Sequence, residues 1–119
     1  HIMKGFFKFG SPVIELSIEG RKIETLLDTG FNGHIMLPLP IIRELALDKI
    51  GISDYLTASG DDKVTEVYMG RITFLNKKIE VPILSTDADF SLAGMELFHD
   101  SKIIIERNKD FVEVSKFLK

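Results

Sequence analysis

The chain of 119 residues contains no cysteine. This absence excludes thiol catalysis, thiolate metal ligands and disulfide bonds, because each of them requires a cysteine sulfur. It leaves open whether the protein works in a reducing or an oxidising compartment.

The chain also lacks a basic block and a long apolar run. Its 15 Lys and Arg residues are outnumbered by 18 Asp and Glu residues, and the formal net charge is −3. Proteins that bind nucleic acid neutralise phosphates with clustered cations, so no nucleic-acid partner is expected. No apolar run approaches the roughly 20 residues of a membrane-spanning helix. The first residues contain no apolar segment of a signal peptide, so we expect no membrane partner and a cytoplasmic location.

Length and composition favour one globular domain. A chain of this size can bury a core without disulfide or metal staples. Its content of 45% apolar and 28% charged residues is ordinary for a globular protein. His1 and Ile2 precede Met3 and have the look of a tag remnant. We therefore assign residues 1–3 to a tag remnant and the start, and expect residues 4–119 to form a single domain.

Short segments with strand character dominate the sequence. Residues 13–19 alternate apolar and polar side chains, with the period of two that is typical of a half-buried strand. A helix is predicted at residues 41–47, after Pro40 and ended by Gly51, and a brief one at residues 95–100. Many short strands with little helix predict an all-β barrel or closed sheet. Further strands are predicted at residues 23–27, 34–37, 52–58, 64–68, 71–75, 78–84, 102–106 and 111–114.

Six of these strands are predicted to pair as three hairpins. The first spans residues 52–68 and has a polar tip, Ser59-Gly60-Asp61-Asp62. The second spans residues 71–84 and turns at Asn76-Lys77, and the third spans residues 102–114.

The triplet Asp28-Thr29-Gly30 directly follows the predicted strand 23–27. Gly30 permits a sharp backbone bend, and the Thr29 hydroxyl can hydrogen-bond to backbone or to a partner chain. The triplet alone fits two interpretations. Asp28 is either a functional carboxylate at the end of an apolar strand or simply the cap of a β-turn.

Residues 26–38, with the sequence LLDTGFNGHIMLP, resemble the active-site segment of the retropepsin-like (clan AA) aspartic proteases. The small microbial aspartyl proteases of this family are the most similar subgroup. A second family element is matched by Leu92-Ala93-Gly94, where Ala93 replaces a usually larger aliphatic residue. The hairpin 52–68 lies between the two elements, at the place of the family's flap. Phe31 stands where retroviral members more often have Ala, and the terminal hairpin differs from their short terminal strands.

The resemblance implies a closed acid-protease-type β-barrel and an aspartic endopeptidase that acts on a peptide or protein substrate. It implies that Asp28 is catalytic and meets its own copy in a homodimer, with Thr29 and Gly30 as active-site support. No cofactor and no metal are implied. The implied substrate-binding residues are Phe31, Ser59, Gly60, Asp61, Leu92, Ala93 and Gly94.

Three alternatives stay open at this point. Asp87 and Asp89 are other candidate carboxylates, but no glycine turn follows them, and we expect them in a solvated loop. Phe31 and the acidic tip of the first hairpin also fit a non-catalytic or weakly active peptide-binding or dimerisation module on the same fold. A third reading is a processing domain of a longer protein. His34 and His99 lack the spacing of metal ligands.

Overall fold

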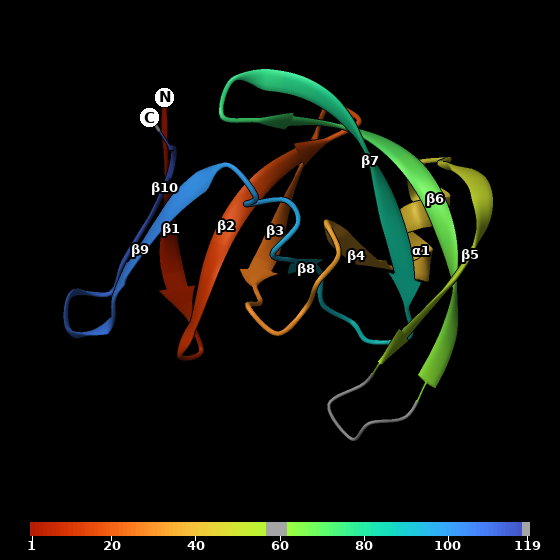
Figure 1. Ribbon diagram of the computed structural model, residues 1–119, viewed down its shortest axis with the longest axis horizontal. Helices are drawn as coiled ribbons and strands as arrows, with labels where there is room; N and C mark the ends of the chain where they lie inside the picture. Colours follow the sequence, from red (N-terminus) through yellow and green to blue (C-terminus); the bar gives the residue numbers. More distant parts are fainter. Residues whose placement is uncertain (57–61, 118–119) are drawn as a thin grey trace.

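The computed structural model describes residues 1–56 and 62–117, so the predicted tip residues Ser59, Gly60 and Asp61 lie outside the described residues. Strands dominate the fold (Figure 1), which confirms the all-β class. The elements are β1 (Ile2–Lys8), β2 (Ser11–Ile18), β3 (Arg21–Leu27), β4 (Ile35–Pro38), α1 (Leu39–Glu44), β5 (Asp48–Leu56), β6 (Asp62–Phe74), β7 (Lys77–Thr86), β8 (Leu92–Ala93), β9 (Ser101–Glu106), the 3₁₀ helix η1 (Arg107–Lys109) and β10 (Phe111–Lys116).

The strands join in the order β5-β6-β7-β4-β8-β3-β2-β1-β10-β9. Because β6 also pairs with β2, through Ser17 with Thr73 and Ile18 with Ile72, the strands from β6 to β2 close into a ring. Strands β1, β10 and β9 extend from β2 as a second sheet region (Figure 1). The ring encloses the apolar core, whose fully buried members include Ile14, Leu16, Ile18, Ile35, Leu37 and Ile83.

Strand β1 was not predicted. It pairs with β10 from Ile2 to Gly5 and with β2 from Phe6 to Lys8. A Cβ atom at Gly5 would lie 2.2 Å from the carbonyl oxygen of Val13. The missing side chain of Gly5 therefore allows the close approach at the point where β1 changes partners.

The predicted strands 64–68 and 71–75 are one strand, β6. It passes through Gly70, where a Cβ atom would lie 2.3 Å from the Ile83 side chain, so this glycine serves packing and not a turn. The following turn has positive φ at Leu75 and Asn76, one residue earlier than predicted. The hairpins β5–β6 and β9–β10 are antiparallel as predicted.

Helix α1 ends at Glu44, before the predicted end at residue 47. Ala46 has a φ of 53°, which ends the helix and sends the chain into β5, where Gly51 borders a register irregularity. The second predicted helix, residues 95–100, is a series of turns. In the described residues, no helix has the length and apolar character to cross a membrane.

Candidate active site

Asp28 is the first residue after β3. Strand β3 runs parallel to β8, with Leu27 opposite Ala93, and β4 runs antiparallel to the same short strand, with Ile35 opposite Ala93. The loop 28–34 therefore leaves the sheet on one side of β8 and re-enters it on the other (Figure 1). The two segments that carry the family resemblance are adjacent in space.

Backbone hydrogen bonds fasten this loop to the segment after β8. The Asp28 N–H donates to the Ala93 oxygen at 2.9 Å, and the Gly94 N–H donates to the His34 oxygen at 2.8 Å. The Met95 N–H donates to the Phe31 oxygen at 2.8 Å. Because bonds run in both directions, the position of Asp28 depends on residues 93–95 as much as on β3.

The Asp28 carboxylate is oriented by its own loop. Its Oδ1 accepts a 2.9 Å hydrogen bond from the Gly30 N–H, while the Asp28 carbonyl accepts one of 3.2 Å from the Phe31 N–H. A Cβ atom at Gly30 would lie 3.3 Å from the same Oδ1, so glycine leaves room for the carboxylate. Asp28 is half-buried, whereas Thr29 and Gly30 are exposed. A carboxylate held on one oxygen keeps the other available to bind or transfer a proton.

Phe31 packs inward from this loop. Its ring lies so close to Gly33 and Gly94 that a Cβ atom at Gly33 would be 2.6 Å from Cζ and one at Gly94 would be 2.5 Å from Cδ2. Phe31 is half-buried. The two glycines form the space that the ring fills, so Phe31 supports the loop that carries Asp28.

A cavity of about 420 Å³ opens beside Asp28. Of the predicted site residues, Asp28, Thr29 and Leu92 line it, whereas Ala93 and Gly94 are buried behind it. Asp87 and Asp89 are exposed and do not line it. The six other lining residues were not among the predicted site residues: Ser11, Pro12, Leu26, Leu27, Phe90 and Ile105. Phe90 stands directly before Ser91-Leu92, and its proximity to that element was the available signal.

A second cavity, of about 400 Å³, lies between β6 and the end of β7. Thr65 donates its hydroxyl to the Ser85 oxygen at 2.7 Å across this boundary. Glu66 accepts a hydrogen bond from the Tyr68 hydroxyl, which lowers the pKa of Glu66, and the nearby Lys49 lowers it further. The same bond to Glu66 raises the pKa of Tyr68.

Burial lowers the pKa of His34, and the nearby Glu96 carboxylate opposes this effect. His34 belongs to the loop that carries Asp28. Protonation of His34 should therefore change the stability of this loop. Within the described ranges, no group of three or more His, Cys, Asp and Glu residues is arranged to hold a metal ion.

Comparison with known proteins finds solved structures that have a similar fold. No family model matches the sequence, and no curated protein matches it. A retropepsin-like aspartic protease from Rickettsia conorii is similar, with a TM-score of 0.68 and 24% identity over 96% of this chain and 88% of that one. The EIAV protease complexed with the inhibitor HBY-793 gives a TM-score of 0.65 and 20% identity, over 76% and 86%.

The protease of Simian Foamy Virus (mac) gives a TM-score of 0.53 and 22% identity, over 69% of this chain and 86% of that one. All three similarities are similarities of fold, at 20–24% sequence identity. The protein therefore has a retropepsin-like fold, as the resemblance of residues 26–38 implied.

Proposed function

We propose that this protein is an aspartic endopeptidase whose catalytic pair consists of Asp28 from each of two identical chains. The observation that carries the proposal is the placement of Asp28: half-buried, hydrogen-bonded to the Gly30 N–H and at the wall of a cavity. The retropepsin-like fold supports it, because the solved proteins of this fold named above are proteases.

Hydrolysis of a peptide bond in this class uses two carboxylates that share one proton, because like charges about 3 Å apart do not both ionise readily. The ionised carboxylate takes a proton from water, and the water oxygen attacks the carbonyl carbon of the substrate. The protonated carboxyl donates to the carbonyl oxygen and stabilises the negative charge that develops there. The tetrahedral intermediate then collapses, and the amine leaves with a proton.

One chain contains a single Asp-Thr-Gly triplet. A two-fold symmetric homodimer would supply the second carboxylate, since each residue on the axis meets its own copy. The exposed Thr29 hydroxyl forms no hydrogen bond within residues 1–56 and 62–117, which leaves it available to the partner chain's loop. Gly30 keeps the backbone open near the carboxylate.

The peptide substrate would contact the cavity wall at Leu92 and the exposed Phe90 ring. Phe31, Ala93 and Gly94 would shape the site from behind. Ser59, Gly60 and Asp61 remain our candidates for a flap that folds over bound peptide and excludes water.

Replacing Asp28 by Asn tests the proposal. Cleavage of a denatured protein at acid pH should fall by roughly 10²- to 10⁴-fold, while the melting curve and circular dichroism stay those of wild type. Asp87→Asn is the matched control, because Asp87 is exposed and does not line the cavity of Asp28. Undiminished cleavage by Asp28→Asn would rule out the catalytic role.

Oligomeric state separates the proposal from its alternative. Sedimentation at micromolar concentration should reveal a dimer. A stable monomer without cleavage would instead favour a peptide-binding module on the same fold, and a dimer without cleavage would favour a dimerisation module.

A further inference from the structure

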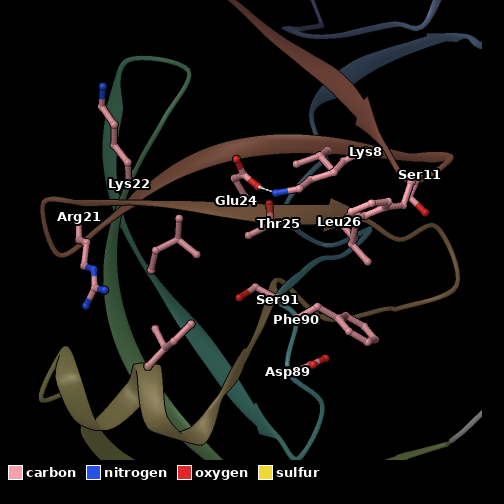
Figure 2. A pocket seen from close by; sticks show the side chains of 14 residues that line it. Lys8, Ser11, Arg21, Lys22, Glu24, Thr25, Leu26, Asp89, Phe90 and Ser91 are labelled. Atoms are coloured by element: carbon pink, nitrogen blue, oxygen red, sulfur yellow. Dashed lines mark hydrogen bonds and ion pairs between the residues drawn. The ribbon is translucent and has the colours of Figure 1, made fainter.

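A cavity of about 620 Å³ forms a groove between β3 and α1 (Figure 2). We call it the β3 groove. Its apolar lining comes from Ile23 and Leu26 of β3, Ile41 of α1 and Phe90. Its charged lining mixes cations such as Lys22 with anions such as Asp89 and Glu24, so the groove has no dominant sign. It therefore suits an apolar side chain better than a charged group.

The β3 groove runs along an open strand edge. The Leu26 N–H donates to the Ser91 oxygen at 2.8 Å, and pairing between β3 and β8 covers only Leu26 and Leu27. Backbone groups of alternate residues face the same edge of a strand, so the N–H and C=O of Glu24 and Lys22 also face this edge. In the described part of the chain, no strand pairs with β3 there. An extended peptide could add to this edge by backbone hydrogen bonds.

Ser91 supplies a polar group inside the groove. It is 4% exposed, and its hydroxyl has no hydrogen-bond partner among the described residues. Figure 2 shows this hydroxyl pointing into the groove. Because no side-chain oxygen of the described residues is both fully buried and without a partner, this hydroxyl is open to the groove, and a bound peptide group can replace water as its hydrogen-bond partner.

The two walls of the groove are tied together at one end. Arg21 lines the groove from β3 and its Nη1 lies 2.6 Å from Oε2 of Glu44 on α1. Figure 2 shows the Arg21 side chain directed toward α1. This exposed ion pair connects β3 with α1 at the end of the groove remote from Phe90.

At its other end the β3 groove adjoins the cavity of Asp28. Ser11, Leu26 and Phe90 line both spaces. Figure 2 shows Leu26, Ser11 and Phe90 on the side of the groove away from Arg21 and Lys22. A polypeptide bound beside Asp28 would therefore lie next to the groove and could extend into it past these three residues.

We infer that the β3 groove binds a second segment of the polypeptide substrate, away from the scissile bond. The segment lies extended along the free edge of β3, places an aliphatic side chain against Ile23 and Ile41, and hydrogen-bonds to the Ser91 hydroxyl. This inference rests on the proposed function, because the occupant is the chain that is cleaved at Asp28. It makes the enzyme selective for long substrates with an apolar residue at a remote position.

Two degenerate peptide libraries test the inference. Peptides of roughly 12 residues extend to about 40 Å, beyond the 37 Å longest dimension of the protomer, whereas peptides of roughly 5 residues, about 17 Å, reach only the cavity of Asp28. Cleavage of the long library by wild type should show a preference for aliphatic residues at a remote position. Ser91→Ala should weaken kcat/KM for the preferred long peptides about fivefold and leave the short library unaffected.

Ile41→Arg is a second variant that fills the groove from α1. Leu45→Arg is its matched control: Leu45 directly follows α1 and is also partly buried against the core, but it does not line the groove. Ile41→Arg should abolish the remote preference and Leu45→Arg should keep it. The inference is overturned if wild type has no remote preference, or if Ser91→Ala and Ile41→Arg both retain it.

Retention of the long library by Asp28→Asn, measured by mass spectrometry of bound peptides, separates the two proposals. Suppose that wild type cleaves nothing, that Asp28→Asn retains peptides with the remote aliphatic residue, and that the double variant with Ser91→Ala does not retain them. The β3 groove is then a binding site, and the catalytic proposal is wrong. Equal retention with and without Ser91→Ala would overturn the groove as a binding site.

Discussion

The amide of Asp28 donates a 2.9 Å hydrogen bond to the carbonyl oxygen of Ala93. The backbone of Asp28, at the end of β3, is therefore held by β8, which comes much later in the sequence. Gly94 follows Ala93 and packs against the Asp28 loop so closely that a Cβ atom there would lie 2.3 Å from the Gly33 oxygen. The geometry of the site thus depends on residues that do no chemistry.

Gly94→Ala should therefore destabilise the protein and displace the Asp28 loop. The added methyl group would meet two backbone oxygens, those of Gly33 and Phe31, which cannot rotate away as a side chain can. Overpacking of this kind costs about 1–3 kcal/mol. The midpoint of urea unfolding should fall accordingly, with an unchanged slope.

Gly51→Ala is the control for this change. Gly51 lies in β5, and a Cβ atom there would meet no atom within 4 Å. Its free energy of unfolding should stay within about 0.5 kcal/mol of the wild-type value. Equal destabilisation by both variants would show that the loss of glycine flexibility matters, and not the collision at Gly94.

Mixing wild type with Asp28→Asn should lower the cleavage activity per wild-type chain. If the two carboxylates come from two chains, random exchange with an equal amount of variant leaves about half of the wild-type chains in wild-type dimers. Cleavage per wild-type chain should fall to about half after exchange. Adding the same amount of extra wild type serves as the control and should not lower it. Unchanged activity per wild-type chain would mean that a single chain holds a complete site.

The local patterns of the sequence predicted the class of the fold better than its connections. The alternation in residues 13–19 was enough for β2, because one face of that strand is buried. Gly5 and Gly70 were harder to interpret. Both lie inside strands where a neighbouring carbonyl or side chain occupies the Cβ position, and such crowding is visible only after distant segments are brought together.

The candidate site was predictable to a similar extent. Asp28 and Leu92 carried the family resemblance, and the structure places both at one cavity. Ile105 lines the same cavity from β9, but nothing in the local sequence around Ile105 distinguishes it from other strand residues. Its position follows from the pairing of β10 with β1, which depends on a strand that was not predicted.

The β5–β6 hairpin offers a titration experiment. The hydrogen bond from Tyr68 is the main reason that the pKa of Glu66 is lowered, and Lys49 is the second. In Tyr68→Phe, the pKa of Glu66 should rise toward its ordinary range, which NMR of the Glu66 carboxyl carbon would follow directly. Lys49→Gln should also raise the pKa of Glu66. An unchanged pKa of Glu66 in Tyr68→Phe would contradict the role of this hydrogen bond.

The loop of Asp28 should also lose stability in acid through His34. Burial lowers the pKa of His34, so the folded protein binds this proton less readily than the unfolded chain, where His has an ordinary pKa of about 6.5. The stability contributed by neutral His34 is full above that value and is lost as the pH falls through it toward the lowered folded pKa. Between about pH 7 and pH 5, wild type should therefore lose more melting temperature than His34→Gln. His99→Gln, which removes an exposed imidazole, should follow the wild-type curve. Parallel curves for wild type and His34→Gln would show that His34 does not couple protonation to folding. This loss of stability matters for the proposed enzyme. The acid pH at which the Asp28 pair holds its shared proton would also weaken the loop that positions Asp28.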